Sequence, residues 1–314
     1  MSLAVFIDLV EARTKLASIL PFTVGIAFTL AYFHQLNGLN TVLFFVAMLL
    51  FDMMTTALNN LMDYQKAKDQ HYKANVNIIG TAKLKVKTVQ ALIITLLAVA
   101  TGLGLILVWR TGWLLLVIGA ACFVIGIFYT FGPLPLSRLP LGEVFSGVTM
   151  GLGIPLIAVY VNVDAAKLLD LQLAWPQLAL TGDWRALLSL GLVCVAPMGT
   201  IANIMLANNL SDYDQDVANH RLTLPMYLSR AASGRLYWSL ALVGFAAEVL
   251  LVGFGLLPWP VLIGLLALPL VWRQSAQFVA KPDKRLTFPN AIKTLVAENG
   301  ALIVGLLVSW GVSR

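Results

Sequence analysis

Charged residues are scarce in this chain of 314 residues: Asp, Glu, Lys and Arg make up only 11% of it, against 59% hydrophobic residues. A soluble domain carries about a quarter charged residues, so the composition excludes a soluble globular protein and predicts an integral membrane protein. Cysteine is scarce as well. Cys122 and Cys194 both lie in apolar runs without metal-ligand spacing, which excludes a disulfide framework and a cysteine-based metal site. We also expect no nucleic-acid partner.

Long apolar runs dominate what is present. About nine of them approach the roughly 20 residues that a helix needs to cross a bilayer, and none shows the alternation of a transmembrane strand. We therefore expect an all-α integral membrane protein, with residues 1–314 forming a single polytopic membrane domain. The predicted spans are 16–34, 40–63, 87–109, 113–131, 141–163, 186–211, 236–256, 258–273 and 293–312.

Positive charge is distributed unevenly between the two ends of these spans. Of the 21 Lys and Arg residues, only Arg110, Lys167, Arg185 and Arg314 fall on the side opposite the N-terminus. Cytoplasmic loops carry the excess of Lys and Arg in membrane proteins. The sequence thus predicts a multi-pass protein of the cell membrane whose N-terminus is cytoplasmic, and topology alone accounts for most of the individual charges.

Two nearly identical strings stand where an apolar run meets a polar one: NNLMDY at 59–64 and NNLSDY at 208–213. The predicted topology puts both strings on the cytoplasmic side. Internal repeats are common in membrane proteins whose site lies between two halves. The repeated string therefore predicts that the chain consists of two pseudo-repeated halves, roughly 1–140 and 141–314.

Each string places amide and carboxylate oxygens on one helix face, because side chains four residues apart lie one above another. The predicted stripes are Asp52, Thr56, Asn59 and Asp63, with Asp69 in the following loop, and Asn208, Asp212 and Asp216. Both stripes end at helix C-termini, where the macrodipole disfavours a carboxylate by about 0.3–1 kcal/mol and like charges repel. A bound cation removes both costs, and such oxygen-rich sites suit Mg²⁺. The alternative is that acidic residues simply end these helices at the interface.

Basic residues accompany both stripes. Lys66 and Lys68 follow the first, Lys83 lies farther along the same loop, and Arg221 stands five residues after Asp216. Carboxylate-bound Mg²⁺ together with Lys or Arg is what a diphosphate requires. A ligand with a diphosphate head and a long apolar tail fits a site of this kind at the rim of a hydrophobic bundle.

These residues resemble the motifs of the UbiA superfamily of intramembrane aromatic prenyltransferases. The first family motif, NDxxDxxx with a further Asp, is similar to NNLMDYQKAKD at 59–69, and the second, DxxxD, is similar to DYDQD at 212–216. The chain departs from the first motif twice. Asn60 replaces the usual first Asp and leaves that cluster one charge weaker, and Ala67 stands where Gly is common.

Three further stretches resemble the 1,4-dihydroxy-2-naphthoate polyprenyltransferase (MenA) branch of that family: EARTKLASILPFTVG (11–25), YTFGPLPLSRLPLGE (129–143) and NNLSDYDQDVANHRLTL (208–224). The resemblance implies a helical bundle around a central cavity. It implies Mg²⁺-dependent transfer of a polyprenyl group from polyprenyl diphosphate to 1,4-dihydroxy-2-naphthoate with loss of CO₂, giving demethylmenaquinone. Another aromatic acceptor, such as 4-hydroxybenzoate, is one alternative, and a cation-coupled membrane transporter is the other.

The resemblance also implies roles for individual residues. The metal ligands it implies are Asn59, Asp63, Asp212 and Asp216. The residues expected to act in catalysis are Asp63, Asp69, Asp212, Asp216 and Tyr129, although an interfacial belt position would equally explain the tyrosine. The residues expected to contact the substrates are Asn59, Asn208, Arg221, Lys66, Lys68, Lys83 and Asp52, the last of them facing the acceptor.

Overall fold

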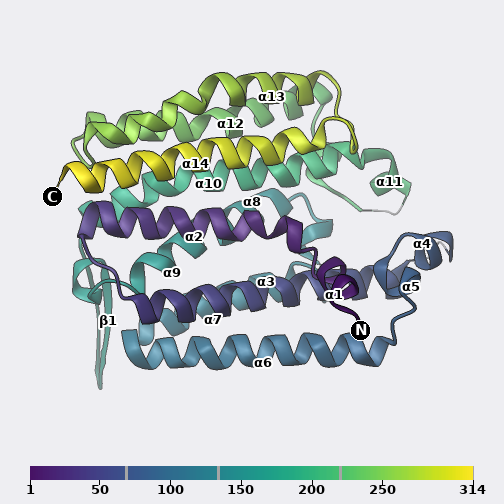
Figure 1. Ribbon diagram of the computed structural model, residues 1–314, viewed down its shortest axis with the longest axis horizontal. Coiled ribbons are helices and arrows are strands. Elements are labelled where there is room, and N and C mark those ends of the chain that lie inside the picture. The colour runs from purple at the N-terminus through teal and green to yellow at the C-terminus, as the bar shows by residue number, and fades with distance from the viewer. Residues whose placement is uncertain (68–69, 133–134, 219–220, 314) are drawn as a thin grey trace.

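A computed structural model describes residues 1–67, 70–132, 135–218 and 221–313 of the chain (Figure 1). Its two strands are β1 (Leu169–Ala174) and β2 (Gln177–Gly182). Its helices are α1 (Leu3–Leu9), α2 (Leu16–Phe28), α3 (Gly38–Lys66), α4 (Gln70–Asn75), α5 (Ile78–Thr81), α6 (Val86–Thr111), α7 (Trp113–Phe128), α8 (Gly142–Ser146), α9 (Ile154–Tyr160), α10 (Trp184–Ser211), α11 (Tyr213–Ala218), α12 (Arg230–Gly253), α13 (Leu268–Ala280) and α14 (Phe288–Val312).

Eight helical segments of the described chain are long and apolar enough to cross a membrane. They are Leu16–Phe33, Gly38–Lys66, Val86–Thr111, Gly142–Tyr160, Trp184–Ser211, Arg230–Gly253, Trp259–Ala280 and Phe288–Val312. The shorter apolar helix α7 lies where a further span is predicted. Each segment coincides with one of the predicted spans, and the all-α integral membrane fold is confirmed.

The span Trp259–Ala280 departs most from its predicted bounds of 258–273. Its first part, Trp259–Ala267, is a 3₁₀ helix that runs directly into α13. A 3₁₀ helix rises about 2.0 Å per residue against 1.5 Å for an α-helix. The 3₁₀ part therefore covers more length per residue than an α-helix would. The span ends at Ala280, seven residues beyond its predicted end.

Helix α10 forms the centre of the bundle. In its apolar window 67% of the residues are buried inside the protein, against 22% for α6 at the periphery. It begins at the N-cap Asp183, whose carboxylate accepts the backbone N–H groups of Arg185 and Ala186, an arrangement that stabilises a helix by about 1 kcal/mol. The π-helical segment Gly147–Gly153 crosses α10 so closely that a Cβ at Gly151 would lie 2.4 Å from the Met198 backbone.

Both repeated strings lie at the same end of the bundle. Helices α4 and α5, which follow α3, and helix α11, which follows α10, occupy one end in Figure 1, together with α1. The hairpin of β1 and β2 and the C-terminus occupy the other end. The hairpin was not predicted, and the alternation in LDLQLA and QLALTG is its local signal.

Candidate active site at the end of the bundle

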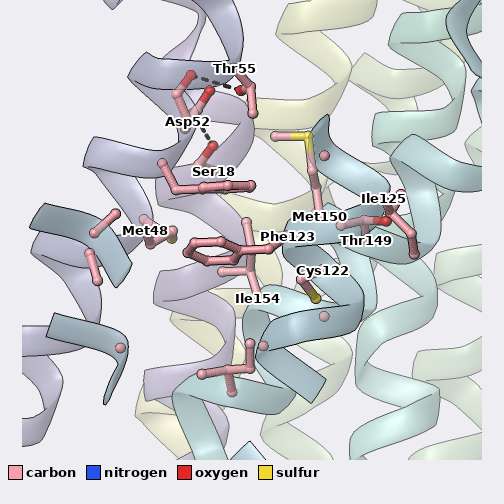
Figure 2. A pocket seen from close by; sticks show the side chains of 18 of the residues that line it. Ser18, Met48, Asp52, Thr55, Cys122, Phe123, Ile125, Thr149, Met150 and Ile154 are labelled. Atoms are coloured by element: carbon pink, nitrogen blue, oxygen red, sulfur yellow. Dashed lines mark hydrogen bonds between the residues drawn. The ribbon is translucent and has the colours of Figure 1, made fainter. Parts of the chain in front are cut away.

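A cavity of about 680 Å³ lies among α2, α3, α6, α7 and α9. Figure 2 shows its gradient of polarity: Asp52, Ser18 and Thr55 gather on one side, and apolar side chains such as Met48 and Phe123 continue the wall from there. The cavity can therefore hold a ligand that is polar at one end and apolar along the rest.

An ion pair is built into the polar side of the cavity. The Lys15 ammonium lies 2.7 Å from the Asp52 carboxylate and donates a second hydrogen bond of 2.7 Å to the Thr56 hydroxyl. The Ser18 hydroxyl donates to the other carboxylate oxygen of Asp52. Only 5% of the Lys15 side chain and 18% of the Asp52 side chain are exposed. Asp52 lines the cavity, as its stripe predicts, in an orientation that Lys15 and Ser18 fix.

The two asparagines of NNLMDY point to different partners. Asn59 lines the cavity, and its side-chain oxygen accepts a hydrogen bond from the Thr130 hydroxyl. The side-chain amide of Asn60 instead donates to the Leu9 backbone carbonyl at 3.0 Å. The backbone carbonyl of Asn60 accepts a hydrogen bond from the side-chain amide of Asn77. Asn60, the residue that departs from the family motif, thus ties α1 and the loop after α4 to α3.

Aromatic side chains form part of the cavity wall. The rings of Phe51 and Phe123 stack with centroids 4.0 Å apart. Tyr129 also lines the cavity, and its hydroxyl is enclosed without a hydrogen-bond partner among the described residues. A tyrosine hydroxyl is protonated at neutral pH, so this one is available to donate a hydrogen bond.

The second string presents two oxygens to a single cation. Asn208 Oδ1 and Asp212 Oδ2 each lie 2.5 Å from the ammonium of Lys284, which comes from the loop between α13 and α14. The ammonium is a stand-in ion: it shows that an amide oxygen and a carboxylate oxygen converge on one point, as a Mg²⁺ site requires. Asn208 and Asp212 thus fit the ligand types expected for that metal.

The third acid of this motif has a different environment. Helix α10 ends at Ser211 and the short helix α11 begins at Tyr213. The Asp212 N–H still donates to the Asn208 carbonyl at 3.0 Å and the Asp216 N–H to the Asp212 carbonyl at 2.8 Å, so the four-residue spacing continues across the junction. Asp216 is buried and lies 3.4 Å from the guanidinium of Arg221. Burial raises the pKa of the Asp216 carboxyl, whereas Arg221 lowers it.

The segment at 129–143 connects the two motifs. Thr130 bonds Asn59 of the first, as described above, and Arg221 beside the second donates to the Ser137 carbonyl at 3.4 Å. At the end of the segment, buried Glu143 accepts a hydrogen bond of 2.8 Å from Asn209. The stretch that most resembles the prenyltransferase branch is thus the physical bridge between the two strings.

The first acidic cluster is more open than the second. Asp63 is exposed, as are Lys66 and Lys83. Tyr72 of α4 lies within electrostatic reach of both clusters: burial raises its pKa, Asp63 raises it further, and Arg221 lowers it. Lys68, Asp69 and His220, a further motif position, lie outside the described residues.

The described residues contain no group of three or more His, Cys, Asp or Glu that could hold a metal ion. Within them, the Asn208 and Asp212 oxygens meet at the Lys284 ammonium. The predicted metal ligands Asn59 and Asp63 lie on α3, at the same end of the bundle.

Several residues at this end were not predicted as part of the site. Lys15 was assigned to membrane topology, yet it is buried against Asp52. Glu143 and Thr130 belong to the segment that resembles the branch, which is the signal that could have found them. Lys284 is 72 residues from its partner Asp212, and nothing in the local sequence points to the pairing.

Comparison with known proteins agrees with the resemblance seen in the sequence motifs. The sequence profile of the UbiA prenyltransferase family matches residues 18–293. The 1,4-dihydroxy-2-naphthoate octaprenyltransferase of Bacillus subtilis (strain 168) is 26% identical, over 96% of this chain and 92% of its own length.

Two solved structures share the fold. A UbiA homolog from Aeropyrum pernix K1, in its apo form, has a TM-score of 0.69 at 14% identity and covers 93% of this chain and 98% of its own. A UbiA homolog from Archaeoglobus fulgidus, bound to DMAPP and Mg²⁺, has a TM-score of 0.64 at 12% identity and covers 98% of this chain and 99% of its own. At these identities the likeness is one of fold.

Proposed function

This chain belongs to the UbiA prenyltransferase family and is a membrane-embedded transferase, and from that premise we propose that it transfers a polyprenyl group from polyprenyl diphosphate to 1,4-dihydroxy-2-naphthoate. The reaction depends on Mg²⁺, releases CO₂ and gives demethylmenaquinone in its reduced, quinol form. The relative named for this acceptor supports the choice.

One observation carries the proposal: a cavity graded from polar to apolar reaches Asn59 of the first string, at the end of the bundle where the oxygens of the second string converge on a cation. The apolar part suits a polyprenyl tail, and the polar end suits the reacting groups. A transferase that joins an apolar polyprenyl chain to a polar aromatic ring needs an apolar part and a polar end in one continuous cavity.

We assign the diphosphate to the end of the bundle where the two strings lie. Asn59, Asp63, Asp212 and Asp216 would hold Mg²⁺ there, with Asn208 beside them and Asp69 in the loop. When bound, the metal neutralises the diphosphate charge and makes it a better leaving group. Arg221 and the loop lysines Lys66, Lys68 and Lys83 add positive charge around the departing oxygens.

The bond between the allylic carbon and the diphosphate oxygen breaks, and its electron pair leaves with the diphosphate. The Tyr129 hydroxyl donates a hydrogen bond to that oxygen. The aromatic faces of Phe51 and Phe123 stabilise the positive charge left on the allylic carbon, because a ring face attracts a cation. The enclosed Tyr129 hydroxyl in the cavity wall and the stacking of the two rings support these roles.

The acceptor lies against Asp52. Its ring hydroxyl donates to the Asp52 carboxylate, which Lys15 and Ser18 hold in place. The ring carbon that carries the carboxylate bonds to the allylic carbon. The bond to the carboxylate then breaks, CO₂ leaves, and the electron pair returns to the ring, so no base is needed at that carbon.

We place this end of the bundle on the cytoplasmic side of the cell membrane, together with the N-terminus, because most Lys and Arg residues lie there. Both substrates would then meet at the inner interface, the acceptor arriving from water and the polyprenyl chain from the lipid.

The test is an assay of the purified protein with Mg²⁺, geranylgeranyl diphosphate and one acceptor at a time. Carboxyl-labelled 1,4-dihydroxy-2-naphthoate should release labelled CO₂ in step with the prenylated product, and EDTA should stop both. Product from 4-hydroxybenzoate alone, with its carboxylate retained, would assign the enzyme to the other acceptor class. Absence of product with every acceptor would reject the proposal.

A further inference from the structure

Lys284 takes a position that the proposed function leaves unexplained. Its ammonium lies 2.5 Å from both Asn208 Oδ1 and Asp212 Oδ2, where we place the metal. It also sits over the ring of Phe288, 5.0 Å from the centroid. The Lys284 ammonium thus occupies the position between the two oxygens at which the second motif would bind a metal cation.

The loop that carries Lys284 is built to hold it there. Asp283 accepts the backbone N–H groups of Arg285 at 2.9 Å and Leu286 at 2.8 Å, and these bonds lower the pKa of its carboxyl. The Thr287 hydroxyl accepts the Asp283 N–H at 2.9 Å and donates to the Lys281 carbonyl at 2.7 Å. Hydrogen bonds on both sides of Lys284 therefore fix the backbone from which it extends.

The lysine is nevertheless easy to displace. Its side chain is 43% exposed, and exposed ion pairs are weak because water screens them. Two cations cannot share the same pair of oxygens, since like charges repel. A metal ion that binds Asn208 and Asp212 must therefore push the ammonium away.

We propose that Lys284 is a tethered counter-cation, which neutralises the second motif before substrate arrives and moves to the diphosphate oxygens when metal and diphosphate bind together. This inference rests on the proposed function of the same site. A free metal ion gains the two oxygens only by displacing the lysine into water. Metal with diphosphate also offers the lysine new anionic partners, so the site selects the complex over the metal alone.

Metal binding without turnover tests the inference. Mn²⁺ binding to the purified protein, followed by electron paramagnetic resonance, should be about two- to fivefold tighter in Lys284→Gln than in the unmodified protein, the factor that a weak exposed ion pair corresponds to. In the presence of Mn²⁺, geranylgeranyl thiolodiphosphate should bind Lys284→Gln about tenfold more weakly, because a charged contact is lost.

Two variants serve as controls. Arg285→Gln removes the same charge from the next residue of the loop and should leave both affinities unchanged, while Lys284→Arg should keep both near those of the unmodified protein. Equal Mn²⁺ affinity in Lys284→Gln and the unmodified protein would overturn the inference, and so would an equal change in Arg285→Gln.

The same titrations separate this inference from the proposed function. If the unmodified protein binds Mn²⁺ with the thiolodiphosphate and Asp212→Asn does not, the metal site stands whatever Lys284 does. If the unmodified protein binds neither, the proposed function fails and the role of Lys284 fails with it.

Discussion

Two lysine–aspartate pairs accompany the two repeated strings, and their lysines differ in exposure. Lys15 and Asp52 are enclosed, with side chains 5% and 18% exposed. Lys284 and Asp212 are open, at 43% and 22%. The first pair is held from three directions, by Ser18, Thr56 and the Asp52 carbonyl. A lysine–aspartate pair thus forms a fixed part of the cavity wall near the first string and an exposed contact in the second.

The comparison extends to the asparagines. In each string the first one, Asn59 or Asn208, presents its oxygen to a donor across the site. The second one, Asn60 or Asn209, anchors a neighbouring segment instead. What the two strings share is therefore a division between a presenting and an anchoring asparagine, and what separates their surroundings is the exposure of the nearby lysine.

The largest expected effect is on the enclosed pair. Lys15→Met leaves Asp52, which is half-buried beside the cavity, without its partner. The loss of stability should approach the value of about 3–5 kcal/mol that is typical of a fully buried pair. The double variant Lys15→Met/Asp52→Leu should recover most of that loss, since no unpaired charge remains. Unfolding in mixed SDS micelles measures both. Equal stability of the single variant and the unmodified protein would show that the pair is not enclosed.

The next effect is on the second motif. Asp212→Asn should lower kcat by a factor on the order of 10²–10³, the loss seen when one group that stabilises a developing charge is removed. Its unfolding free energy should change little. Asp63→Asn in the other string is the matched variant. Full activity in either one would remove that residue from the proposed metal site.

A smaller effect is expected for Tyr129, which lies between the two motifs. Tyr129→Phe should reduce kcat about 10- to 100-fold, because a hydrogen bond to a charged group contributes about 1.5–3 kcal/mol. Stability should be equal or slightly higher, since the buried hydroxyl has no partner within the described chain. Loss of stability with kcat unchanged would assign the tyrosine a purely structural role.

The smallest effect separates the two lysines. Lys284→Gln should change the unfolding free energy by less than about 1 kcal/mol, as expected for an exposed ion pair, although it removes the same charge as a change at Lys15. Lys15→Met, measured in the same micelles, is the reference. A loss of several kcal/mol of unfolding free energy in Lys284→Gln would contradict the difference between the two pairs.

Length and hydropathy were sufficient to predict the membrane fold, because each span needs about 20 apolar residues wherever it packs. The transporter alternative is decided by the family match, which identifies a transferase. The stripe from Asp52 to Asn59 was predictable because both residues lie on one helix, whose geometry fixes their spacing.

Other parts of the site depend on contacts that no local pattern encodes. Lys15 reaches Asp52 across 37 positions, and Lys284 reaches Asp212 across 72. That Asp212 and Asp216 share one face stays a prediction, although backbone hydrogen bonds four residues apart link Asn208, Asp212 and Asp216 across the end of α10.

The cavity is lined almost wholly by residues 11–157. Within the described chain, Met205 alone lines it from α10–α14. The wall residues Phe44, Met48 and Leu115 are also buried in one core cluster with Leu190 of α10. Exchanging them therefore reshapes the chamber and disturbs the packing at once, so a protein engineer seeking new acceptors or shorter chains has to follow stability beside product.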